Sequence, residues 1–169
     1  MRIALVKGTG LICRFIRWQT RSEFSHAAIL DSNGVVYEAA TTGVRSWRAI
    51  STDDEGIYAA LKRKFGAELE ILNVETTPDQ ERAVLQFLWR QLSKRYDFTM
   101  VFRFLTREQE ARSSTNKWFC SELVFAAFQK AGINLLERIE PWEVSPGLLA
   151  YSPLAVSDQE AATIEESRV

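Results

Sequence analysis

The chain has 169 residues and a formal net charge of −1, with 46% hydrophobic and 25% charged residues. This length suits one domain with a substantial buried core, and the near-neutral charge argues against a general nucleic-acid binder, which is usually basic. Positive charge is still concentrated in the first third of the chain, at Arg14, Arg17, Arg21, Arg45 and Arg48. We interpret this cluster as a solvated basic face in preference to an anion site.

Cysteine and histidine are scarce, which limits the possible chemistry. The chain holds two cysteines, Cys13 and Cys120, and a single histidine, His26. They provide neither the disulfide framework of a small secreted domain nor a convincing zinc set. The apolar runs are too short for a membrane span of about 18 residues or for a signal peptide. We therefore expect no cofactor, no metal, no integral membrane segment and a cytoplasmic location.

Short strands dominate the first half of the chain. Apolar or alternating segments bounded by turn residues indicate strands. The expected strands are Ile3–Val6, Ser25–Leu30, Val35–Ala40, Gly43–Trp47 and Glu68–Val74. Between the first two, the segment Leu11–Trp18 has apolar residues at helical spacing and predicts a short amphipathic helix.

Helices dominate the second half. Thr77 as N-cap and Pro78 as first helical residue predict a helix that continues to about Ser93. We then expect a shorter aromatic-rich helix, a polar loop, a helix stopped by a glycine and a further helix start, at Tyr96–Leu105, Arg107–Asn116, Phe119–Ala131 and Val144–Gly147. Beyond them, Leu148, Leu149 and Tyr151 are expected to pack on the core.

The order of these elements predicts the fold class. Strands first and helices mostly later indicate an α+β protein. No repeat or linker divides the chain, so we expect a single domain over residues 1–156. The segment 157–169 is small, acidic and aperiodic, which predicts a flexible tail.

Cys120 is the first candidate for chemistry, because it lies at the start of the expected helix Phe119–Ala131. Unpaired N–H groups and the positive end of the helix dipole stabilise a thiolate at such a position. The alternative is a core residue, since free cysteine is often buried. The residues that share its helical face are apolar: Leu123, Val124, Ala127 and Ala131. Position alone favours the core alternative.

His26 and Glu38 are polar residues inside otherwise apolar strands. A buried imidazole needs hydrogen-bond partners, and burying an unpaired carboxylate costs free energy. A cysteine-dependent enzyme needs a base, and His26 is the only histidine available. Glu38 would then orient the imidazole and stabilise its charged form. The residues alone leave two alternatives open, a structural histidine and a glutamate that faces solvent.

The loop between the two strands decides whether His26 and Glu38 share a face, because residues alternate between faces along a strand. A two-residue loop, which Asn33-Gly34 favours locally, puts them on opposite faces. A three-residue loop with Gly34 in the left-handed region pairs Ala28 with Glu38 and leaves His26 diagonally beside Glu38. We predict the longer loop, because it gives both buried polar residues a partner.

Four stretches of the chain, in this order, resemble the NlpC-like cysteine peptidase superfamily: Ser25–Ile29, Tyr37–Ala39, Tyr96-Asp97 and Trp118–Val124. In the usual members of that group the cysteine helix precedes the histidine strand, whereas here the histidine strand comes first. That order resembles the circularly permuted, papain-like branch, the YaeF/YiiX-like proteins, with lecithin retinol acyltransferases as more distant relatives. The resemblance covers nearly the whole chain.

This resemblance implies a catalytic triad of Cys120, His26 and Glu38 on a small barrel-like antiparallel sheet packed against helices. It also implies that Tyr96 lies near the active site. Ser25 and Trp118 belong to the matched stretches, and we expect them to contribute to substrate or oxyanion binding.

The expected activity is that of a thiol hydrolase of the amidase or peptidase type, which works through an acyl-thioester on Cys120. The backbone N–H of Cys120 is placed to help bind the oxyanion. An acyltransferase on the same triad is one alternative, and a non-catalytic binding domain is another. The expected substrate is a small molecule, peptide or lipid with an amide or ester bond. Cys13 has no base nearby in the sequence, so we expect Cys120 to be the reactive thiol.

Overall fold

A six-stranded antiparallel sheet forms the centre of the protein, in the strand order β4-β3-β2-β1-β5-β8. The computed structural model describes residues 1–49, 53–98 and 116–157. The strands of this sheet are β1 (Arg2–Lys7), β2 (His26–Leu30), β3 (Val35–Ala40), β4 (Gly43–Arg48), β5 (Glu68–Val74) and β8 (Ala155–Ser157). A separate parallel pair consists of β6 (Arg95–Tyr96) and β7 (Lys117–Trp118). All five expected strands are confirmed.

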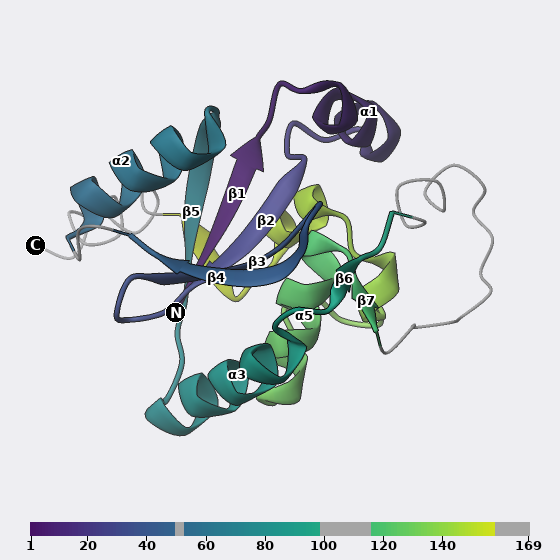
Figure 1. Cartoon of the computed structure of the whole chain (residues 1–169). Coiled ribbons are helices and arrows are strands. Elements are labelled where there is room, and N and C mark those ends of the chain that lie inside the picture. The colour runs from purple at the N-terminus through teal and green to yellow at the C-terminus, as the bar shows by residue number, and fades with distance from the viewer. Residues whose placement is uncertain (50–52, 99–115, 158–169) are drawn as a thin grey trace, which may run out of the picture.

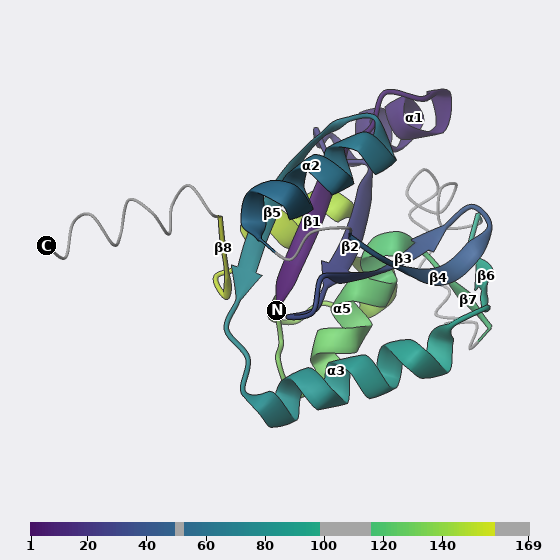
Figure 2. The same cartoon turned by 60° about the vertical axis from the view of Figure 1, so that its left-hand side comes forward.

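Helices cover both faces of the sheet (Figures 1 and 2). The α-helices are α1 (Leu11–Thr20), α2 (Asp54–Phe65), α3 (Pro78–Gln91) and α5 (Cys120–Lys130), and two 3-10 helices follow, η1 (Pro141–Glu143) and η2 (Pro146–Tyr151). The α+β class predicted from the element order is therefore confirmed. No helix within the described ranges has both the length and the apolar character needed to cross a bilayer.

Alternation along β1 divides the core into two clusters. Ile3 and Leu5 pack in the cluster that contains α3 and α5, whereas Ala4 and Val6 pack in the cluster that contains α2. Because successive residues of a strand point to opposite faces, a continuous apolar strand such as β1 must be covered on both sides. The larger cluster lies on the α5 side, so the N-terminus of α5 is set directly against the sheet.

The N-terminal cap of α3 is the one that the sequence predicts. Thr77 Oγ1 accepts a hydrogen bond from the Gln80 backbone N–H at 3.2 Å, and Gln80 Oε1 accepts one from the Thr77 N–H at 2.9 Å. Pro78 occupies the first helical position, where its missing N–H leaves no bond unmade. The helix ends at Gln91, two residues before the expected end.

Helix α2 was not predicted from the sequence. This helix nevertheless has clear boundary signals: Asp53 Oδ1 accepts a hydrogen bond from the Gly56 N–H at 2.8 Å, and Gly66 ends the helix in the left-handed region with φ of +60°. Ile57 and Leu61 bury its inner face, four residues apart. α2 matters for function because its last residue, Phe65, contacts the candidate site.

Other expectations need correction. The helix expected from Tyr96 to Leu105 is wrong at its start, because Arg95–Tyr96 forms β6 and bonds the backbone of the 116–118 segment. The rest of that helix and nearly all of the loop expected over residues 107–116 lie outside the described residues. The helix start near Val144 is confirmed as η2, but its Tyr151 is 80% exposed and does not pack on the core. Ser157 belongs to β8, and residues 158–169 of the expected tail lie outside the described ranges.

Candidate active site

Three elements bring the predicted triad residues to one place. His26 is the first residue of β2, Glu38 lies inside β3, and Cys120 is the first residue of α5. The N-terminus of α5 packs on the sheet at β2 and β3 (Figure 1). Residues that are 94 positions apart in the sequence are thus neighbours in the fold.

The hairpin between β2 and β3 has the predicted register. Ala28 pairs with Glu38, and the Asp31 N–H donates to the Val35 carbonyl at 3.0 Å, which closes a three-residue loop. Gly34 has a φ of +73°, in the left-handed region that favours glycine. Asp31 also accepts hydrogen bonds from the backbone N–H groups of Asn33 and Val35, at 2.9 and 2.8 Å. This side-chain contact stabilises the longer loop against the shorter one that Asn-Gly favours.

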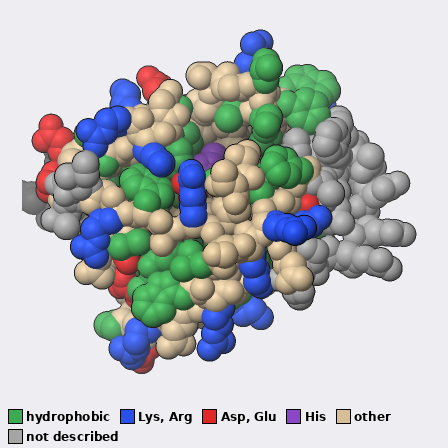
Figure 3. Space-filling model, viewed as in Figure 1, with side chains coloured by type: hydrophobic (Ala, Val, Ile, Leu, Met, Phe, Trp, Pro, Cys, Tyr) green, Lys and Arg blue, Asp and Glu red, His purple; other side chains and the backbone are tan. Residues whose placement is uncertain are grey.

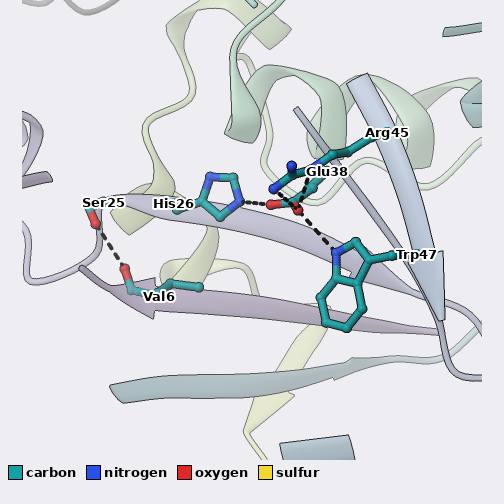
Figure 4. Close-up of polar contacts among 6 residues, drawn as sticks. All are labelled: Val6, Ser25, His26, Glu38, Arg45 and Trp47. Atoms are coloured by element: carbon teal, nitrogen blue, oxygen red, sulfur yellow. Dashed lines mark hydrogen bonds and ion pairs between the residues drawn. The ribbon is translucent and has the colours of Figure 1, made fainter. Parts of the chain in front are cut away.

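This register places the His26 and Glu38 side chains on the same face of the sheet. His26 Nε2 and Glu38 Oε2 are 2.7 Å apart (Figure 4). Glu38 is 1% exposed, and His26 keeps 17% of its side chain exposed. A short contact between an ionisable pair of this kind is a charge-assisted hydrogen bond, which is stronger than a neutral one.

Two residues of β4 hold the other carboxylate oxygen of Glu38. Arg45 donates to Oε1 from Nε at 3.0 Å and from a terminal guanidinium nitrogen at 2.9 Å, and Trp47 Nε1 donates to the same oxygen at 3.1 Å (Figure 4). These two partners of Glu38 were not predicted from the sequence. The signal was present, because a tight turn pairs Glu38 with Arg45 across β3 and β4 and puts Trp47 on the same face.

Cys120 contacts the other side of the imidazole. Cys120 is close enough to His26 to raise the pKa of the imidazole, and since Nε2 faces Glu38, the nitrogen left for the thiol is Nδ1. Cys120 itself is fully buried. Both alternatives for Cys120 therefore apply: it belongs to the larger core cluster, and it lies near enough to His26 to shift the pKa of the only histidine of the sequence.

The residues of the site shift one another's pKa values toward the charged forms of His26 and Glu38. Burial alone would lower the pKa of His26, but hydrogen bonds to Cys120 and Glu38 and their negative charges raise it from 6.5 to about 10. Burial alone would raise the pKa of Glu38, but the hydrogen bond and charge of His26, together with Arg45, lower it to about 2. At neutral pH the pair is therefore an imidazolium beside a carboxylate.

Tyr96 lies beside the thiol, as the motif comparison implied. Burial raises the pKa of its phenol, and the adjacent Cys120 raises it further. Its ring packs against Phe98 and Phe119, with centroid separations of 4.9 and 5.8 Å. A phenol held neutral next to the sulfur is a fixed hydrogen-bond donor at that position.

Ser25 and Trp118 make contacts that tie elements together. The Ser25 hydroxyl donates to the Val6 carbonyl at 3.3 Å and accepts from the Gly8 N–H at 3.0 Å. Trp118 Nε1 donates to Gln91 of α3 at 3.1 Å. These bonds fix the start of β2 and the strand before α5. Direct contact of either side chain with a substrate or oxyanion stays a prediction.

The aromatic ring of Phe65 packs against the imidazole. The Phe65 ring lies 5.3 Å from the His26 ring and 6.3 Å from the Trp47 ring, measured between centroids. The space-filling view shows the purple histidine at the base of a depression in the surface (Figure 3). Phe65 is a contact that the sequence analysis missed, because it belongs to the helix that was not assigned.

The whole chain can be compared with known proteins. No family model and no curated protein matches it. A solved structure does match: the crystal structure of the metalloprotein YiiX from Escherichia coli O157:H7, DUF1105, with a TM-score of 0.57 and 20% sequence identity over 94% of this chain and 88% of that chain. This chain has the YiiX fold. At this identity the likeness concerns the fold alone, and it agrees with the YaeF/YiiX-like resemblance of the sequence motifs.

Proposed function

We propose that this protein is a cysteine-nucleophile hydrolase that uses Cys120, His26 and Glu38. The observation that carries the proposal is the single histidine of the sequence, which is bonded through Nε2 to a buried carboxylate and whose pKa responds to the neighbouring Cys120 thiol. A structural histidine also needs hydrogen-bond partners. A structural role does not require that the second ring nitrogen face a cysteine at a helix N-terminus, whereas a catalytic role does. Membership of the NlpC superfamily belongs to this proposal.

The reaction proceeds in two steps. In the first, the Cys120 sulfur attacks a substrate carbonyl carbon as the thiolate partner of the His26 imidazolium, and the imidazolium gives its Nδ1 proton to the leaving amine or alcohol and becomes neutral. In the second, the neutral His26 takes a proton from water and the resulting hydroxide attacks the thioester. The carbon–sulfur bond breaks, the acid leaves, and the pair of thiolate and imidazolium is restored. Glu38 keeps the imidazole oriented and stabilises its charge in both steps.

Donors for the developing oxyanion lie at the start of α5. The backbone N–H of Cys120 belongs to the first turn of the helix, where N–H groups have no intrahelical partner. Tyr96 adds a neutral phenol beside the sulfur. Cys120 is fully buried, so a substrate must displace neighbouring side chains before attack.

The YiiX neighbour is described as a metalloprotein, but the residues of this site do not fit a metal. Within residues 1–49, 53–98 and 116–157, no group of three or more His, Cys, Asp or Glu side chains is arranged to hold an ion. Both oxygens of Glu38 already accept hydrogen bonds, one of them from the Arg45 guanidinium, whose positive charge opposes a metal cation there. The proposal therefore routes no step through a metal.

Activity-based labelling tests the proposal directly. The native protein is treated with a panel of acyl electrophiles, and the modified residue is mapped by peptide mass spectrometry. We expect a covalent adduct on Cys120 that Cys120→Ala abolishes and the matched variant Cys13→Ala retains. A panel that labels neither cysteine, or that labels Cys13 alone, would support the non-catalytic binding domain instead.

Acyl transfer is the second candidate function on the same triad. The thioester of the first step reacts with an amine or alcohol in place of water if such an acceptor reaches it. Product analysis with and without an added acceptor distinguishes hydrolysis from transfer, because only transfer gives an acceptor-dependent amide or ester. In either case the proposed substrate is an amide or ester of a small molecule, peptide or lipid. The cytoplasmic location stays a prediction.

A further inference from the structure

Helix α1 exposes apolar side chains to solvent. Leu11 is 83% exposed and Trp18 is 69% exposed, and Phe15 between them is partly exposed. These residues follow i, i+4 and i+7 spacing, so they form one stripe along the helix. Ile12, at 50%, borders the stripe, whereas Ile16 faces the core. Large apolar residues gathered on one surface mark an interaction site more often than isolated ones do. We call Leu11, Ile12, Phe15 and Trp18 the α1 apolar patch.

Positive charge accompanies this patch. Arg14 and Arg21 are exposed beside it. Arg17, also on this helix, donates a hydrogen bond of 3.3 Å to the Gly8 carbonyl. The first acidic residue of the chain is Glu23, beyond the end of α1. An amphipathic helix with Leu, Phe and Trp on one side and arginines beside them is suited to the boundary of an anionic lipid layer.

The patch lies next to the candidate active site. Cys13 is on the inner side of α1, and its sulfur lies against Gly8, whose N–H donates to the hydroxyl of Ser25 next to His26. Figure 3 shows green apolar side chains over α1, on the same face of the molecule as the depression that holds the histidine. A surface that binds α1 would therefore lie near the opening to the site.

We propose that α1 docks on an anionic lipid surface, with the α1 apolar patch inserted among the headgroups and acyl chains and with Arg14 and Arg21 facing the anionic headgroups. The charge pattern favours this occupant: an apolar protein groove does not require a stretch with three arginines and no acidic residue, whereas an anionic surface attracts it. The binding does not depend on the chemistry proposed for Cys120. It brings the thiol site to a lipid–water boundary.

Vesicle sedimentation of the full chain tests the docking. The probes are vesicles of phosphatidylglycerol and phosphatidylcholine, mixed, and of phosphatidylcholine alone. We expect the protein to bind the anionic vesicles at least tenfold more tightly than the neutral ones, with affinity that falls as salt rises. The double variant Leu11→Ser/Trp18→Ser should lose most of this binding. Arg14→Gln/Arg21→Gln should lose the preference for anionic vesicles.

Two controls separate docking from other effects. Trp89→Ser removes a tryptophan of similar exposure, 60%, from α3, which lies far from α1 in Figure 1, and should bind like the wild type. Cys120→Ser should also bind fully, so that failure of docking and failure of the catalytic proposal are distinguishable. Circular dichroism verifies that each variant is folded. Equal affinity for both vesicle types, or equal losses of binding in Trp89→Ser and the patch variant, would overturn the proposal. A wild type that binds neither vesicle type would also overturn it and would point to a protein partner.

Discussion

Glu38 is the residue on which the site depends most. It is almost fully buried, yet His26, Arg45 and Trp47 all bond its two oxygens. A buried carboxylate is tolerated only with such compensation, because unpaired burial is costly. The sequence indicated that Glu38 needed a partner, and the structure shows partners at both of its oxygens.

Replacing Glu38 by glutamine should separate orientation from charge. The amide introduced by Glu38→Gln would donate to Nε2 of His26, which favours the neutral imidazole and so lowers the pKa of His26 from about 10. We expect the fold to be kept, turnover to fall by roughly 10²-fold or more, within the range acid–base groups contribute, and the alkaline limb of the pH–rate profile to move to lower pH. Glu68→Gln, at an exposed position of β5, is the control. A wild-type pH profile in Glu38→Gln would remove Glu38 from the mechanism.

Trp47 should contribute to stability through its hydrogen bond to the carboxylate. Trp47→Phe keeps an aromatic ring against Phe65 but removes the N–H that reaches Glu38. Hydrogen bonds to charged groups are worth about 1.5–3 kcal/mol, and neutral ones about 0.5–1.5 kcal/mol. Chemical denaturation should therefore show a larger loss than in Trp89→Phe, whose Nε1 donates to the neutral Tyr37 hydroxyl in the wild type. Equal losses would mean that the carboxylate gains little from Trp47.

At the scale of elements, the β2–β3 hairpin positions the site. Local propensity alone gives the wrong loop, because Asn-Gly favours two residues. The correct register followed from asking which pairing satisfies both buried polar residues. The contacts that stayed unpredicted are of a different kind: β6 is two residues long and pairs with a strand more than 20 residues later, so no local pattern indicates it.

Gly34 should be sensitive to substitution, because it belongs to the loop that sets the register of the β2–β3 hairpin. Its φ of +73° disfavours any side chain, so Gly34→Ala should destabilise the protein by roughly 1–2 kcal/mol and disturb the Ala28–Glu38 pairing. Gly10→Ala is the matched control, because its φ is −62° and an added Cβ meets no atom within 4 Å. Denaturation midpoints compare the two. A Gly34→Ala protein as stable as the control would show that the loop tolerates another conformation.

At the scale of the whole molecule, the site joins two parts of the chain that the sequence could not place together by periodicity. His26 and Glu38 are close in sequence, so hairpin geometry predicts their contact. Cys120 reaches them through the packing of α5 on the sheet, which only the family resemblance anticipated. The helix α2, which carries Phe65 to the imidazole, was missed although Asp53 and Gly66 mark its ends.

The charged pair should also shape the pH dependence of global stability. The folded-state pKa of His26 is raised to about 10, so its contribution is complete below its ordinary value of 6.5 and is lost as pH rises through 10. The pKa of Glu38 is lowered to about 2, so its contribution is present above 4.5 and is lost as pH falls through 2. Denaturation measured across pH should show the alkaline loss in the wild type and a smaller one in His26→Gln. An identical alkaline slope in both proteins would contradict the coupling.

The most direct test of the central claim is the reactivity of the two cysteines toward iodoacetamide in the native protein, with adducts mapped at several pH values. We predict faster alkylation of Cys120 than of Cys13, although Cys120 is buried and Cys13 is only partly so. His26→Gln should slow the alkylation of Cys120 and leave the rate at Cys13 unchanged, because Cys120 is the cysteine that interacts with the imidazole. Preferential modification of Cys13, or a Cys120 rate that does not respond to the loss of His26, would contradict the account.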